Sequence, residues 1–154
     1  MQITPGDLTD KRVIDLLHHH LSNSRAHTAP GSDHALDLKG LQSPGITFWT
    51  AWDGETLNAT GALKQLSHYH GEIKSMHTVS AARRNGVGSA MLAHIIAFAR
   101  SRGMSRLSLE TGSWDYFQPA VALYRRHDFV ECPPFGDYVP DPNSIFMTLE
   151  LSKR

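Results

Sequence analysis

A short stretch rich in arginine and glycine, Arg83-Arg84-Asn85-Gly86-Val87-Gly88, has the residue types needed to bind an anion. It lies between a segment typical of a strand and a segment typical of a helix. The main-chain N–H groups at a helix start point at a bound anion, and the helix dipole adds partial positive charge. Glycines let a ligand approach the main chain, and the arginines add charge-assisted contacts. We therefore expect this loop to hold a pyrophosphate.

Two other phosphate-binding motifs are absent from the sequence. The Walker pattern Gly-x-x-x-x-Gly-Lys-Ser/Thr does not occur, and neither does the dinucleotide fingerprint Gly-x-Gly-x-x-Gly. By local physics alone, a Gly-x-Gly at a helix start is a weak signal, because a tight turn or close packing also explains it. The loop therefore needs support from the rest of the chain.

Histidines and one cysteine are the other reactive side chains. His18-His19-His20 lies late in an expected helix, where consecutive residues point in different directions, so we interpret it as solvated and expect no metal site. Cys132 is the one cysteine, which excludes an internal disulfide and fits a reducing compartment. No histidine base can be placed beside it, so the sequence gives no support to a covalent acyl-cysteine route.

Periodicity and turn signals predict the elements that position these residues. Apolar spacing from Leu8 to Leu21 predicts a helix capped by Thr9 or Asp7, and Asp53-Gly54 suits a type I′ hairpin turn. Further helices are expected at about 33–41, from Val87 to about Arg102, and from Pro119 to about His127. Strands are expected at 46–52, 56–66, 72–79, 106–111, 129–132 and 144–151.

This order of elements predicts the fold class and, with composition, limits the function. A hairpin followed by strand–helix–strand–helix–strand–strand indicates an α+β or α/β sandwich with a mostly antiparallel sheet, and we expect one domain over residues 1–154. Fifteen basic residues balance 15 acidic ones, which argues against broad nucleic-acid binding. No secretory signal and no run of about 20 apolar residues is visible, so we expect a cytoplasmic protein that does not enter a membrane.

Two separated segments carry a resemblance to a known family. Arg83-x-x-Gly86-x-Gly88 resembles the Arg/Gln-x-x-Gly-x-Gly/Ala motif of the GNAT superfamily of N-acetyltransferases, in its usual place between a strand and a helix. Residues 120–129 are similar to the family's Ala-x-x-Leu-Tyr-x-x-x-Gly-Phe segment, with Asp128 in place of the glycine. We expect a slightly strained turn there. Residues 47–52, 71–76 and 133–138 resemble a bacterial subgroup of the family.

The resemblance implies the GNAT fold and a site for acetyl-CoA, the acyl donor. In this fold a mixed, mostly antiparallel sheet, flanked by about four helices, splays open at the donor site. The strand before the loop would pair with the pantetheine arm, and the loop would hold the pyrophosphate. The residues implied are Met76, His77, Thr78, Val79, Arg83, Arg84, Asn85, Gly86, Val87, Gly88 and Ser89.

The resemblance also suggests how catalysis proceeds, by direct attack of an amine on the thioester. Tyr124 matches the family tyrosine that protonates the departing thiolate, and a main-chain N–H at Met76 or His77 would stabilise the oxyanion. Glu72 stands where some members have a catalytic glutamate. Glu72, Glu110, a histidine such as His70 or His77, or a water molecule remain alternatives for the general base.

The expected function is N-acetylation of a small metabolite, an amino acid or a peptide, and a non-catalytic acyl-CoA-binding or sensor module is the alternative. The variable segments 22–45, 68–71 and 133–143 should determine the acceptor, because loops on a rigid scaffold carry specificity. Arg25, His27 and His34 are candidates to bind an acceptor carboxylate or phosphate. The apolar alternation from Ile145 to Leu151 is compatible with a homodimer and equally with a core-facing strand.

Overall fold

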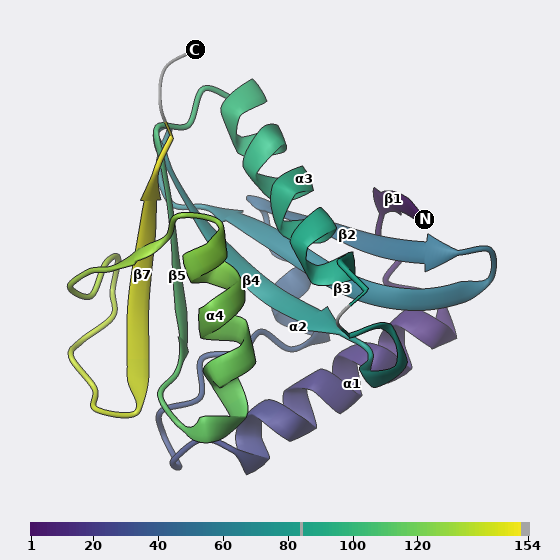
Figure 1. Cartoon of the computed structure of the whole chain (residues 1–154), viewed down its shortest axis with the longest axis horizontal. Helices are drawn as coiled ribbons and strands as arrows, with labels where there is room; N and C mark the ends of the chain where they lie inside the picture. The colour runs from purple at the N-terminus through teal and green to yellow at the C-terminus, as the bar shows by residue number, and fades with distance from the viewer. Residues whose placement is uncertain (84, 152–154) are drawn as a thin grey trace.

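The computed structural model describes residues 1–83 and 85–151. Its seven strands form one mixed sheet in the order β1-β2-β3-β4-β5-β7-β6, which confirms the expected fold class (Figure 1). Among the described strands, β4 and β5 make the one parallel pair, and the other neighbours are antiparallel. The strands are β1 (Gln2–Pro5), β2 (Ile46–Asp53), β3 (Thr56–Gln65), β4 (His70–Thr78), β5 (Arg106–Gly112), β6 (Val130–Glu131) and β7 (Ser144–Glu150).

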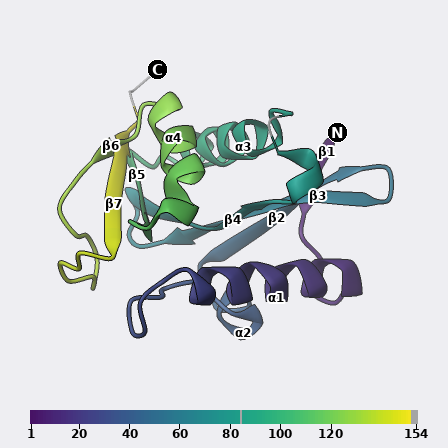
Figure 2. The ribbon, with the colours of Figure 1, turned by 60° about the horizontal axis from the view of Figure 1, so that its bottom comes forward.

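Helices cover both faces of this sheet, giving three layers (Figure 2). Helices α3 (Val87–Ser101) and α4 (Gln118–Arg126) lie on one face, and α1 (Lys11–Ala26) and α2 (Leu38–Leu41) on the other. The larger apolar core lies beneath α3 and α4, and the smaller one lies beneath α1 and α2. No helix in the described ranges is both long and apolar enough to cross a bilayer.

Three local expectations were wrong. The helix expected at about 33–41 is shorter, because α2 covers only Leu38–Leu41 with Asp37 as its N-cap. The hairpin loop between β2 and β3 consists of Gly54 and Glu55, because Asp53 still pairs with Thr56. Of the two loop residues, Gly54 alone has a positive φ, 58°, so the loop is not the type I′ turn, which needs a positive φ at both positions. Helix α1 is capped by Asp10, whose carboxylate accepts the Arg12 N–H, and not by Thr9 or Asp7.

The last strand and the turn before it bear on two further expectations. Met147 and Leu151 are buried in the larger core, and Ile145 and Leu149 pack against it. The alternation along β7 is therefore a core-facing pattern, and a homodimer stays a prediction. Asp128 has φ 71°, the left-handed conformation expected where the family has glycine.

One feature of the sheet determines where a ligand can enter it. β4 and β5 pair only over three residues, from His70 with Arg106 to Glu72 with Ser108. Beyond that point β4 continues along β3 to Thr78, and β5 continues along β7 to Gly112. The two strands diverge, as Figure 1 shows. The expected splay of the sheet is confirmed.

Candidate active site

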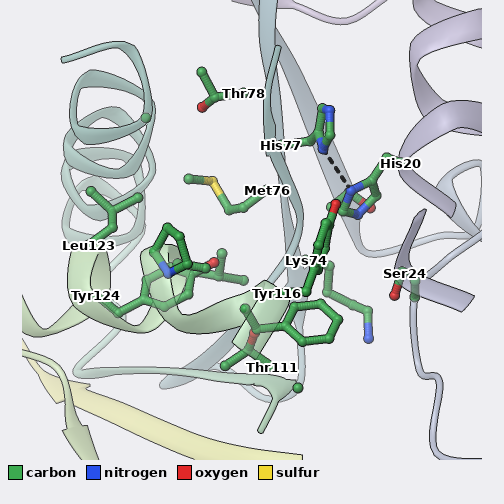
Figure 3. A pocket seen from close by; sticks show the side chains of 18 of the residues that line it. His20, Ser24, Lys74, Met76, His77, Thr78, Thr111, Tyr116, Leu123 and Tyr124 are labelled. Carbon is green, nitrogen blue, oxygen red and sulfur yellow. Dashed lines mark hydrogen bonds between the residues drawn. The ribbon is translucent and has the colours of Figure 1, made fainter. Parts of the chain in front are cut away.

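A cavity of about 790 Å³ occupies the opening between the diverging strands (Figure 3). Main chain and side chains of β4, the start of α3, the end of β5 and helix α4 line one part of it. The end of α1 and the segment after it line the other part. The cavity therefore joins the arginine–glycine loop to the variable segment 22–45 in one continuous space.

A bulge in β4 lies beside the opening, and its residues Ser75 and Met76 line the cavity. Thr60 pairs with His77 and Ala62 pairs with Lys74, so two residues of β4, Ser75 and Met76, lie opposite the single residue Gly61. Ser75 has φ 55°, which an L-residue adopts at a cost. Its hydroxyl is buried and has no hydrogen-bond partner in the described part of the chain. The bulge thus re-aims the main chain next to the cavity and leaves a polar atom available there.

The two glycines of the loop are required for different reasons. Gly86 is the N-cap of α3 with φ 78°, and a Cβ there would meet nothing within 4 Å, so its role is conformational. A Cβ on Gly88 would lie 3.1 Å from Thr78 Oγ1 and 3.3 Å from Leu123 Cδ2. Gly88 therefore allows α3, α4 and the end of β4 to approach one another. Both the tight-turn and the close-packing interpretations apply.

Most of the residues predicted to hold the acyl donor border this one cavity. Val79 and Asn85 do not, and Asn85 borders a smaller cavity of about 280 Å³ beside it. Arg84 lies outside the described residues. Arg126, on α4, adds a second guanidinium that sequence reasoning did not single out. The predicted residues that do line the cavity are Met76, His77, Thr78, Arg83, Gly86, Val87, Gly88 and Ser89.

Tyr124 lies on α4 and lines the same cavity, although only 6% of its surface is exposed. Burial, and then the charge of Glu110, raises the pKa of its phenol above the ordinary value. The phenol is therefore protonated at every pH at which the protein would work. Tyr124 faces the protein interior because it follows Val121 by three residues, which places both side chains on the buried face of α4.

Glu72 is placed differently from Tyr124. It is 3% exposed and is not among the described residues that line the cavity. Its carboxylate accepts a hydrogen bond of 2.5 Å from the Tyr138 hydroxyl and one of 3.3 Å from Lys74 Nζ. Lys74 also donates to the Tyr138 oxygen at 3.0 Å and to the His34 carbonyl at 3.1 Å. Both hydrogen bonds reach the same oxygen of Glu72, Oε2, and together they hold Lys74, which does line the cavity, next to Tyr138 of the 133–143 loop.

Glu110, near the end of β5, does line the cavity. Burial raises the pKa of its carboxyl, and the hydrogen bond of 2.7 Å from Ser144 and the positive charge of Lys74 act in the opposite direction. Glu110 is therefore, like Tyr124, a group at the cavity whose pKa is raised mainly by burial. Its position next to the splay is the one that the sequence order predicts for it.

His20 also lines the cavity, a position that the sequence interpretation missed. His20 Nδ1 lies 3.1 Å from His77 Nδ1 (Figure 3). His18 and His19 are exposed, as expected for a solvated stretch. The signal that would have found His20 is helical spacing: it follows the buried Leu17 by three residues and precedes the buried Ser24 by four. His70 is elsewhere, bonded to Ser108 Oγ at 2.6 Å, and does not line the cavity.

The variable segment closes the far end of the cavity. His34 lines it directly, whereas the Arg25 side chain turns to Asp33, with Arg25 Nε 3.5 Å from Asp33 Oδ2. The ring of His27 stacks on that of Tyr116, with centroids 4.0 Å apart and planes 12° from parallel. This contact joins the end of α1 to the segment that leads into α4.

Comparison with known proteins defines the family. The model of the acetyltransferase (GNAT) family matches residues 14–129 of the 154. The match spans both the arginine–glycine loop and the Leu123-Tyr124 segment. The chain belongs to the GNAT acetyltransferase family.

Relatives that are 40–50% identical to this chain are also named acetyltransferases. The uncharacterized N-acetyltransferase YsnE of Bacillus subtilis is 50% identical over 151 residues, which are 98% of this chain and 100% of YsnE. A protein of Azospirillum brasilense named IAA acetyltransferase is 40% identical over 121 residues, 78% of each chain. This GNAT protein is therefore an enzyme, an acyltransferase.

Solved structures show the same fold. A protein from Klebsiella pneumoniae described as an acyl-CoA N-acyltransferase has a TM-score of 0.79 and 27% identity, covering 98% of this chain and 97% of its own. A GNAT acetyltransferase from Elizabethkingia anophelis, solved with acetyl-CoA bound, has a TM-score of 0.70 and 17% identity, covering 97% of each chain. At that lower identity the likeness shows the GNAT fold alone.

Proposed function

We propose that this enzyme transfers the acetyl group of acetyl-CoA to the amine of a small metabolite, amino acid or peptide, by direct attack of the amine on the thioester. The observation that carries the proposal is the divergence of β4 from β5 after Glu72. It exposes a strand edge inside a cavity that runs from the glycine loop to Tyr124. An extended donor arm and a reacting amine would meet in that space.

The donor half of the cavity has the chemistry that acetyl-CoA needs. Beyond Glu72, the side of β4 that faces β5 has no strand partner in the described residues, so its main-chain groups are free to pair with the amides of a pantetheine arm. The buried Ser75 hydroxyl is also without a partner there. The N-terminus of α3, with Arg83 and Arg126 beside it, suits the pyrophosphate. The bound acetyl-CoA in the Elizabethkingia structure supports the same donor.

The part of the cavity between the bulge and Tyr124 has a group to stabilise each negative charge that the reaction creates. The thioester oxygen becomes negative when the amine attacks, and a main-chain N–H at Met76 or His77, in or next to the bulge, would donate to it. The tetrahedral intermediate then collapses, the carbon–sulfur bond breaks, and the thiolate of CoA leaves. Tyr124, which its raised pKa keeps protonated, would give its phenolic proton to that thiolate. The proton that the attacking nitrogen loses as the amide forms would then restore the phenol.

The size and charge of the cavity favour a compact acceptor. A volume of about 790 Å³ lies within the range of ordinary ligand pockets and must hold the donor arm as well. The acceptor end combines the Lys74 ammonium with the carboxyl groups of Glu110 and Asp33. Such a mixture suits a polar amine better than a long apolar chain.

The test is an acceptor panel with acetyl-CoA, measuring released CoA thiol and confirming the acetylated product by mass spectrometry. The panel contains amino acids, short peptides, di- and polyamines and amino sugars. It also includes IAA, because a relative is named for it. We expect release of CoA that depends on one class of amine. Tight binding of acetyl-CoA with no transfer to any acceptor would contradict the proposal and favour an acyl-CoA-binding module.

A further inference from the structure

Tyr124 is proposed as the general acid, so the reaction still needs a general base to deprotonate the amine. A pair of histidines in the cavity is suited to that role. His77 lies on β4 directly after Met76, and His20 lies on α1, across the cavity wall. Their Nδ1 atoms are 3.1 Å apart, and both side chains line the cavity (Figure 3). We propose that His77 and His20 form a proton relay that takes the proton from the acceptor amine and passes it to solvent. This inference rests on the proposed function and names a catalytic pair within it.

The contact itself determines the protonation of the two rings. Two nitrogens 3.1 Å apart are hydrogen-bonded only if one carries a proton and the other does not. In the neutral pair, one ring therefore has its proton on Nδ1 and a free lone pair on Nε2. The other ring accepts at Nδ1 and carries its proton on Nε2. The pair has one vacant acceptor and one proton ready to leave, at opposite ends.

That arrangement moves one proton without leaving a charge on the protein. The acceptor ammonium gives its proton to the vacant Nε2 of the first ring, and the Nδ1 proton of that ring moves to Nδ1 of the second. The second ring releases its Nε2 proton to water. The amine becomes neutral and nucleophilic, both rings end in the opposite tautomer, and water reverses the tautomers before the next turnover. We assign His77 as the first ring because it follows Met76 in the bulged strand.

The surroundings keep the pair neutral, which a relay requires. Burial lowers the pKa of His77 to about 3, and the nearby His20, Arg83 and His19 contribute in the same direction. Burial also lowers the pKa of His20 to about 4, with His19 acting in the same direction and the charge of Asp33 opposing it. Neither ring is protonated near neutral pH, so the pair rests in the neutral arrangement of tautomers from which the relay starts.

The acidic alternatives are less suited to this step. The Glu72 carboxylate is bonded to Tyr138 and Lys74 and lies off the described cavity lining. Glu110 lines the cavity, but its carboxylate accepts a hydrogen bond from Ser144, and its raised pKa comes mainly from burial. The histidine pair joins β4 to α1 by a direct side-chain hydrogen bond.

The experiment compares His77→Asn, His20→Asn and the double variant with the wild type, and His18→Asn serves as the matched control on the exposed side of α1. We expect kcat/KM for a basic amine to fall about 10²-fold at pH 7 in each single variant, at the low end for positioned proton transfer. The double variant should fall no further, because the two rings act as one unit. The Kd of His20→Asn for acetyl-CoA should stay within about twofold of the wild type, because His20 is outside the residues predicted to hold the donor. The activity of His18→Asn should also stay within about twofold, because His18 is exposed.

Two readouts separate a relay from a structural role. Without a relay the enzyme must take up amine that is already neutral, so the defect should shrink as the pH approaches the acceptor pKa, near 10.4 for an alkylamine. It should also shrink for acceptors of lower pKa. A defect of constant size at every pH and for every acceptor would overturn the relay while leaving acetyl transfer intact. Absence of transfer by the wild type across the panel would overturn the proposed function and the relay with it.

Discussion

The hydroxyl of Thr60 donates a hydrogen bond of 2.8 Å to the carbonyl of Ser75, the one residue inside a strand of the described chain that has a positive φ. Thr60 is fully buried on β3, so a side chain of the neighbouring strand holds the bulge of β4 in place. The bulge is where the main chain turns toward the cavity, and its geometry is therefore part of the donor site.

Replacing Thr60 by valine tests this link. The shape is kept, but the Ser75 carbonyl loses its donor, and leaving a buried acceptor unsatisfied costs about 1–3 kcal/mol. We expect Thr60→Val to lower the free energy of unfolding in urea by that amount and to weaken acetyl-CoA binding measured by calorimetry. Thr60→Ser keeps the hydroxyl and should bind acetyl-CoA like the wild type. Equal binding by Thr60→Val would show that the bulge does not need this bond.

Asp128 holds a left-handed backbone conformation, with φ 71°, at an exposed site. Because an L-residue adopts this conformation at a cost of about 1–2 kcal/mol and glycine does not, Asp128→Gly should stabilise the fold by about 0.5–1 kcal/mol after the greater chain entropy of unfolded glycine is subtracted. Urea unfolding at pH 7 measures the change. Asp128→Ala, which keeps a Cβ, should give no gain, and a gain of the same size would mean that the aspartate carboxylate, not the backbone, is the source.

The His20–His77 pair predicts how stability depends on pH. The folded pKa values of His20 and His77, about 4 and about 3, lie below the ordinary value of 6.5. Between the folded and the ordinary pKa of each ring, the unfolded chain therefore binds more protons than the folded protein. Stability should therefore fall as the pH falls from about 6.5 toward 4, by up to about 1.4 kcal/mol per pH unit for each ring. Thermal unfolding at a series of pH values measures it.

Removing both rings is the control for that pH dependence. In the double variant His20→Asn/His77→Asn, the melting temperature should change less over the same pH range than in the wild type. A slope identical to that of the wild type would show that these two histidines are not the buried neutral groups.

Glu72 should act mainly through Lys74 and Tyr138. Breaking a buried pair by removing one partner costs about 3–5 kcal/mol, because the other charge is left uncompensated. We expect Glu72→Gln to lose part of this stability, since the amide still accepts from Tyr138 and Lys74. The double variant Glu72→Gln/Lys74→Met should lose less than the sum of the single changes. Additive losses in urea unfolding would show that Glu72 and Lys74 do not interact.

A kinetic readout separates this positioning role from that of a general base. If Glu72 were the base, Glu72→Gln would lower kcat strongly with little change in the free energy of unfolding. A positioning role predicts the reverse balance, with stability reduced and a modest effect on kcat.

The sequence predicted the elements that depend on local pattern. The hairpin, the glycine loop and the strand–helix order follow from alternation, turn residues and helical spacing, and the left-handed turn at Asp128 follows from the missing glycine. The bulge at Ser75 was not predictable, because it depends on Thr60 of another strand. The role of Glu72 was not predictable for the same reason, because its carboxylate accepts a hydrogen bond from Tyr138, 66 residues later in the chain.

The histidines show what kind of information was missing. His20 has the helical spacing of an inward-facing residue, but its neighbours His18 and His19 made the stretch look uniformly solvated. Its partner His77 lies 57 residues away, and no local pattern brings the two together. Side-chain pairs that cross from helix to sheet require the packed fold.

The measurement that tests the central claim most directly is the rate of acetyl transfer by Tyr124→Phe, set beside its affinity for acetyl-CoA. The change removes one hydroxyl from a buried ring and leaves the cavity walls in place. We predict that kcat falls by about 10²–10³-fold across the pH range, because the thiolate loses its proton donor, while Kd for acetyl-CoA changes less than about twofold. An unchanged kcat at every pH would contradict the assignment of Tyr124 as the acid and the direct-transfer mechanism built on it.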